Sequence, residues 1–169
     1  VYLPEDEYES LFIDNSSGGI IVPADFTFGD TTIESSSGSV KFAANVTGDA
    51  DIKSTSGSVK LANLNPQNMN VETSSGSIEI TDAGASVAGI TKSSGSMTVT
   101  GGQYGDLVIS STSGSVRAQT LSADDITIEC SSGSIDIVEC NASGHIGTRT
   151  SSGSVELVSC TAGSISANG

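Results

Sequence analysis

The sequence predicts an all-β protein, a single right-handed parallel β-solenoid domain of about eight turns over residues 1–169. Three observations predict it: a Ser-Gly-Ser motif recurs every 19 or 20 residues, apolar and polar residues alternate within short segments, and a helical 3.6-residue period is missing. The repeated glycines are Gly38, Gly57, Gly76, Gly95, Gly114, Gly133 and Gly153. A degenerate copy of the motif, residues 17–20, precedes them.

The first segment, residues 1–14, is expected to form a cap and entry strand. It holds Tyr2, Tyr8 and Phe12, a large share of the few aromatic residues of the chain. A solenoid leaves an open sheet edge at each end, and an unpaired edge invites strand addition. We therefore expect this segment to cover the first turn.

Residues 15–169 are expected to form the stacked repeats. Apolar residues stand two and four positions after each glycine, such as Val59 and Leu61, and five and seven positions before the next, such as Val71 and Met69. The positions between them are polar, which is typical of strands with one buried face. One 19-residue unit cannot bury its apolar face alone, whereas stacked units form a continuous core. Right-handed winding is the expected hand for parallel connections.

The Ser-Gly-Ser motif is expected to make a tight corner in each turn, because glycine adopts positive φ without strain. The seven glycines are therefore predicted to be structural, with their flanking serines stacked in columns along the rod. The same stacking would place Lys53 between Glu34 and Glu72. Exposed pairs of this kind contribute little to stability, so we interpret them as features of register and solubility.

Composition argues against several partners. The chain has six basic and 20 acidic residues, for a net charge of −14. This charge disfavours binding to nucleic acid and to anionic membrane surfaces. The chain has no apolar run near the roughly 18 residues of a transmembrane helix, so direct membrane insertion is not expected. Because the chain begins at Val1 and ends on a strand-like segment, we expect targeting segments and a continuation to lie outside this sequence.

Cysteine and histidine are the residues with the most obvious chemistry. Cys140 and Cys160 occupy the same column in adjacent turns, so either a disulfide or two buried free thiols would fit. Cys130 stands near a corner and is expected to be structural. His145 is the only histidine and is expected in a surface loop, without a patterned carboxylate partner. The repeat therefore does not favour a cysteine nucleophile or a zinc site.

The acidic residues do not form a recognisable ligand set. Calcium-binding solenoids need Gly-Gly-x-Gly-x-Asp repeats, and this chain has neither those nor an EF-hand loop. Residues such as Asp49, Asp51, Asp124 and Asp125 are interpreted as solvated charge. Glycoside cleavage needs two converging carboxylates, and the pattern selects no such pair. We therefore expect no catalytic residue, metal or cofactor.

The recurring (T/S)-S-G-S-(V/I) repeat, as in residues 52–59 (IKSTSGSV), resembles a family of bacterial adhesin-like domains of unknown function. Members of that family carry serial T/S-S-G-D/S-V/I repeats, and residues 8–14 (YESLFID) resemble their entry strand. The resemblance covers nearly the whole chain. It implies a β-solenoid and an envelope or extracellular setting, and it implies no catalytic residues. Serine replaces the aspartate that many members have after the glycine, which further disfavours a metal.

These observations favour a non-enzymatic domain at the cell surface or outside the cell, an adhesin or a binding and scaffold module for a glycan or a protein. One alternative is a self-assembling structural polymer joined end to end. A second is a carbohydrate-active β-helix enzyme, which a groove lined by carboxylates and aromatic residues would support. Four Phe, three Tyr and no Trp disfavour that enzyme.

Overall fold

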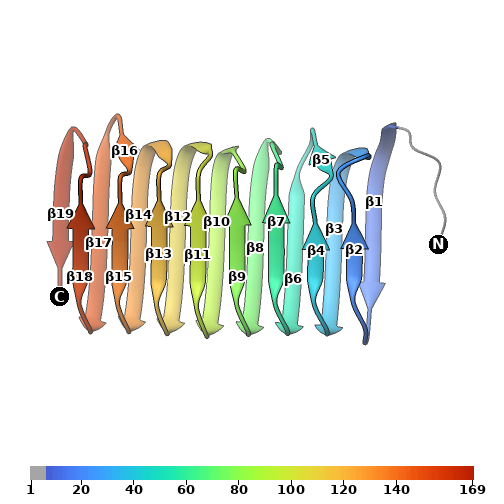
Figure 1. The fold of residues 1–169 in the computed structure, drawn as a ribbon, viewed down its shortest axis with the longest axis horizontal. Helices are drawn as coiled ribbons and strands as arrows, with labels where there is room; N and C mark the ends of the chain where they lie inside the picture. Colours follow the sequence, from blue (N-terminus) through green and yellow to red (C-terminus); the bar gives the residue numbers. More distant parts are fainter. Residues whose placement is uncertain (1–6) are drawn as a thin grey trace.

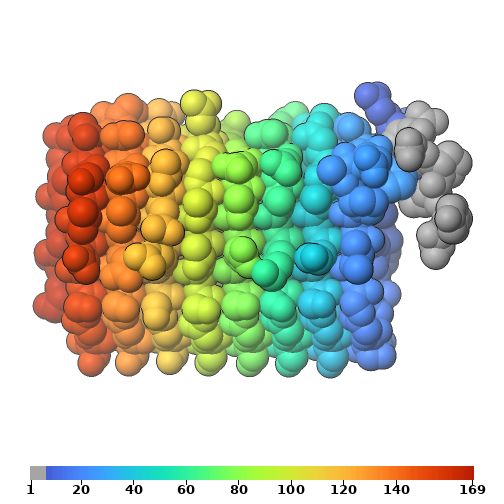
Figure 2. Space-filling view, in the orientation of Figure 1, coloured from blue at the N-terminus to red at the C-terminus, as the bar shows by residue number. Residues whose placement is uncertain are grey.

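The computed structural model describes residues 7–169, which form strands, corners and loops without a helix. Two parallel sheets face each other across the core of a straight, evenly wide rod (Figures 1 and 2). The predicted fold class is therefore confirmed. The nearer short strands in Figure 1 run opposite to the more distant long strands, and the advance of the chain makes the winding right-handed.

The first sheet, here the long-strand sheet, has 11 strands. Its main path contains β1 (Glu7–Asn15), β3 (Thr27–Ser37), β6 (Ala50–Ser56), β8 (Asn68–Ser75), β10 (Ala85–Ser94), β12 (Gln103–Ser113), β14 (Ser122–Ser132), β17 (His145–Ser152) and β19 (Ser164–Asn168). Two short strands, β5 (Asn45–Val46) and β16 (Asn141–Ala142), pair with β3 and β14. The strand β19 begins a ninth turn, one more than the eight that the glycine corners predict.

The second sheet, here the short-strand sheet, has eight strands. They are β2 (Ile20–Val22), β4 (Val40–Phe42), β7 (Val59–Ala62), β9 (Ile78–Thr81), β11 (Met97–Thr100), β13 (Val116–Gln119), β15 (Ile135–Val138) and β18 (Val155–Val158). Each turn of the rod therefore contains one long strand, a Ser-Gly-Ser corner, one short strand and a loop.

The register between strands follows the repeat. Ile33 pairs with Ile52, and Ile52 pairs with Val71, so that neighbours in space are 19 residues apart. All three side chains are buried, as the alternation predicts. The four apolar columns form one core cluster along the rod, and at its last corner Val155 and Leu157 are only partly buried.

The corner glycines all have positive φ, for example 116° at Gly76. They are also packed against one another. A Cβ atom on Gly76 would lie 1.9 Å from the carbonyl oxygen of Gly57, which is much closer than atoms can approach. Gly18, in the first corner, has a φ of 98° but nothing within 4 Å of the same position. The stacking of each corner on the next therefore gives a second reason why glycine is needed there, in addition to its positive φ.

Aromatic residues pack against one another at the N-terminal end of the core. Tyr8 of β1 lies 5.7 Å from Phe28, between ring centroids, and Phe28 lies 6.3 Å from Phe42. Phe26 lies 5.9 Å from Phe28. Such contacts stabilise an apolar end of a core. The strand β1 overlaps the predicted cap and entry strand of residues 1–14, and residues 1–6 of that segment lie outside the described residues.

A buried polar column runs beneath the corners, three residues before each glycine. Its members are Ser35, Ser54, Thr73, Lys92, Ser111, Cys130 and Thr150. The hydroxyls of Thr73 and Ser111 donate to the carbonyl oxygens two residues ahead, over 3.2 and 3.4 Å. These bonds satisfy corner carbonyls that face the interior. This column was not predicted from the sequence, because most of its members are polar residues.

Candidate functional site

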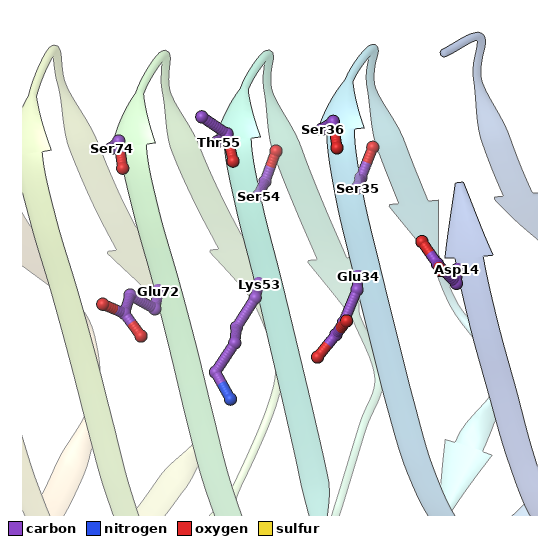
Figure 3. Close-up of a pocket in the computed structure, with 9 residues that line it drawn as sticks. All are labelled: Asp14, Glu34, Ser35, Ser36, Lys53, Ser54, Thr55, Glu72 and Ser74. Carbon is purple, nitrogen blue, oxygen red and sulfur yellow. The ribbon is translucent and has the colours of Figure 1, made fainter. Parts of the chain in front are cut away.

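The candidate site is a polar groove of about 350 Å³ on the outer face of β1, β3, β6 and β8, here called the charged groove (Figure 3). Its lining residues are Asp14, Glu34, Ser35, Ser36, Lys53, Ser54, Thr55, Glu72 and Ser74. They come from the two outward columns nearest the corners and from the serines beneath them. The groove therefore follows directly from the stacking of four turns.

Two rows of side chains define the charged groove. The charged row contains Asp14, Glu34, Lys53 and Glu72, which are direct register partners on adjacent strands. The hydroxyl row contains Ser36, Thr55 and Ser74, which lie two residues further along each strand. Figure 3 shows both rows side by side on the strands. Neighbours in each row are separated by the strand spacing, about 4.8 Å.

Lys53 stands between Glu34 and Glu72, as the repeat predicts, but it makes its ion pair elsewhere. Its Nζ lies 2.8 Å from Oδ2 of Asp51, two residues away on the same strand. The hydrogen bond and charge of Asp51, with smaller contributions from Glu34 and Glu72, raise the pKa of Lys53. The ammonium group is therefore charged at neutral pH, and it stays accessible to a ligand because it is exposed.

Cys140 and Cys160 are both free thiols in the structure. Cys140 is buried and Cys160 is half-buried in the next turn. Burial, with a smaller contribution from Cys160, raises the pKa of Cys140. Cys130 belongs to the buried polar column, where its Sγ donates to the carbonyl of Gly114 over 3.3 Å.

We expect diamide treatment to link Cys140 to Cys160, because column partners in adjacent turns lie within disulfide range. The intact mass should fall by two hydrogens, and Cys160→Ser should abolish this change while Cys130→Ser leaves it in place. The link should form faster at pH 9 than at pH 7, because the thiolate is the attacking species and the pKa of Cys140 is raised. Retention of two reactive thiols after treatment would contradict the predicted pairing.

His145 begins strand β17, whereas the sequence predicted a surface loop. The extra residue of this 20-residue turn is taken up earlier, around the short strand β16. Its ring is also held by neighbours: Nδ1 lies 2.8 Å from Oγ of Ser164, and Nε2 lies 3.0 Å from Oγ of Ser166. The prediction of a loop residue was therefore wrong. His145 links β17 to β19.

The acidic residues outside the charged groove hold adjacent turns together. Oδ1 of Asp49 accepts from the backbone N–H and the side-chain Nδ2 of Asn68, over 3.2 and 2.8 Å. Oδ1 of Asp125 accepts from the backbone N–H of His145 over 2.6 Å. Within residues 7–169, no three His, Cys, Asp or Glu side chains are grouped so that they could hold a metal ion.

The part of the chain that the structure describes contains no helix long and apolar enough to cross a membrane. A model of one protein family matches the sequence twice, over residues 1–95 and 47–168, and the family is described as Toastrack DUF4097. No curated protein and no solved structure matches the chain. The two overlapping matches cover almost every turn of the rod. The chain belongs to the Toastrack DUF4097 family.

Proposed function

We propose that this Toastrack domain is a non-enzymatic binding module, displayed at the cell surface or outside the cell, whose charged groove contacts a glycan or a protein surface. One observation carries the proposal. The charged row and the hydroxyl row lie parallel on one outer face, with exposed Lys53 at their centre. This arrangement offers hydrogen-bonding groups at regular intervals over four strands.

The chemistry of the two rows suits a polyhydroxylated ligand. The hydroxyls of Ser36, Thr55 and Ser74 both donate and accept hydrogen bonds, and the carboxylates of Glu34 and Glu72 accept them. Lys53 can donate charge-assisted bonds, which are stronger than neutral ones. A repeat of about 4.8 Å is close to the width of one sugar ring, so successive strands could contact successive sugars.

Two further features support a binding role over catalysis. Lys53 separates Glu34 and Glu72 in the charged row and pairs with Asp51, so these two carboxylates do not form an isolated hydrolytic pair. The groove is also formed by rigid stacked strands whose register leaves little freedom for closure over a substrate. The net charge of −14 supports a soluble, extracellular rod.

A glycan array tests the proposal. We expect the wild-type domain to bind a restricted set of glycans, and Lys53→Met to bind them about ten- to a hundredfold more weakly, as loss of a charge-assisted bond predicts. Arg117→Met is the matched control, because Arg117 is an exposed cation on β13 of the other sheet. That variant should bind like the wild type, and bound glycans should show no new reducing ends.

Other results would point to the alternatives. Release of reducing ends would favour a carbohydrate-active enzyme. Silence across the array, together with light scattering that grows with protein concentration, would favour a self-assembling polymer joined end to end.

A further inference from the structure

A second groove lies on the opposite face of the rod, on the outer side of β2, β4, β7 and β9. It encloses about 310 Å³, and we call it the apolar groove. Its lining includes the apolar residues Ile21, Pro23, Ala43 and Ala62 and the charged residues Lys41, Lys60 and Glu79. It shares no lining residue with the charged groove.

The repeat explains how the apolar groove forms. Five residues after the corner glycine stand Pro23, Ala43 and Ala62, which are short side chains on the outer face. Three residues after it stand Ile21, Lys41 and Lys60, which are long ones. A row of short side chains beside a row of long ones leaves a trough along the rod. Ile21 is 75% exposed, an unusual state for a large aliphatic side chain.

The positive charge at this groove is unbalanced. Lys41 and Lys60 are direct register partners on β4 and β7, and like charges directly opposite each other destabilise a sheet. Lys60 is neutralised by Glu79, whose Oε2 lies 2.5 Å from its Nζ. Lys41 has no ion-pair or hydrogen-bond partner for its side chain within residues 7–169, and its neighbour on the other side is Ile21.

We propose that the apolar groove binds one anionic amphiphile, a single aliphatic chain with a carboxylate head. The head lies against Lys41, and the chain lies over Pro23, Ala43 and Ala62 against Ile21. Charge complementarity selects this occupant, because Lys41 has no side-chain partner within residues 7–169 and lies beside an apolar floor, whereas Lys60 is held by Glu79. An extended anionic bilayer fits less well, since a rod of charge −14 is repelled from it.

Calorimetric titration with octanoate tests this inference. We expect saturable binding of one octanoate per chain. Acetate, which has the head alone, and 1-octanol, which has the chain with an uncharged hydroxyl head, should bind at least about tenfold more weakly. Lys41→Met should weaken octanoate binding about tenfold through loss of a charge-assisted contact. Ile21→Ser should weaken it through loss of apolar contact.

The control separates this site from the charged groove. Lys53→Met should bind octanoate like the wild type. Octanoate binding at the apolar groove is therefore tested separately from glycan binding at the charged groove. Because Lys41 is exposed, Lys41→Met should also keep the wild-type melting temperature. Equal octanoate affinity in the wild type and in Lys41→Met would overturn the proposal. Binding to anionic vesicles without any binding of monomeric octanoate would overturn it as well.

Discussion

Replacing Gly76 with alanine is expected to lower the melting temperature by about 10 °C or more. The new Cβ would lie 1.9 Å from the carbonyl oxygen of Gly57, and the residue would keep a φ of 116°. The corner must shift or the stack must open, which places the loss near the large end of single substitutions, about 4 kcal/mol. Gly76→Val and Gly95→Val should be at least as severe, and thermal unfolding followed by circular dichroism measures the loss.

The matched control for this prediction is Gly18→Ala. Gly18 has a similar positive φ of 98°, but a Cβ there would meet nothing within 4 Å. Backbone strain should therefore be the only destabilising effect of Gly18→Ala, and it should lower the free energy of unfolding by about 1–3 kcal/mol. If Gly18→Ala and Gly76→Ala melt at the same temperature, close stacking of the corners does not contribute to stability.

Replacing Lys92 with methionine is expected to stabilise the rod by about 1–3 kcal/mol at pH 7, the usual cost of burying a polar group. Lys92 is 1% exposed in the buried polar column, and its Nζ donates to the carbonyl oxygen of Gly95. Burial lowers the pKa of Lys92, with a smaller opposing effect from Cys130. Methionine has a similar length and removes the buried charge. Ser111→Ala in the same column is the control and should be slightly destabilising, because it removes a hydrogen bond to a corner carbonyl, as Lys92→Met does, without removing a buried charge.

The pH dependence of this effect has a defined sign. Between the lowered pKa of Lys92 and its ordinary value of 10.5, the unfolded chain binds a proton that the folded chain does not. The contribution of Lys92 to the free energy of unfolding therefore rises with pH in that window. The advantage of Lys92→Met should shrink as pH is raised from 7 to 10, as measured by urea unfolding. A constant or growing advantage would contradict a lowered pKa.

Most of the fold could be predicted from the sequence because the repeat is regular. The glycine spacing determines the length of a turn, and the alternation assigns Val59 and Leu61 to the interior. The same alternation also places the position of Lys92 inside, two residues after buried Ile90. That signal was hidden because the serine, threonine and lysine at this position are polar.

The grooves could not be predicted from column patterns alone. The repeat pattern shows which residues are neighbours on adjacent strands. The shape of a groove depends on the lengths and conformations of the side chains that line it. Lys53 illustrates this: its register partners are Glu34 and Glu72, yet its side chain turns to Asp51 on its own strand. The prediction that His145 lies in a loop was wrong for a different reason. One added residue in its turn made the start of β17 hard to locate from the repeat.

Each 19-residue turn of the rod is an equivalent unit that is stabilised by stacking on its neighbours. Deleting residues 77–95 joins Gly76 to Ser96 and removes one complete turn while keeping every other corner intact. We expect a folded, shorter rod with the same β-sheet circular dichroism per residue and a cooperative melt, whereas deleting residues 77–86 should abolish that melt because it shifts the register. Loss of the cooperative melt on removal of residues 77–95, or equal behaviour of the two deletions, would contradict this equivalence of the turns.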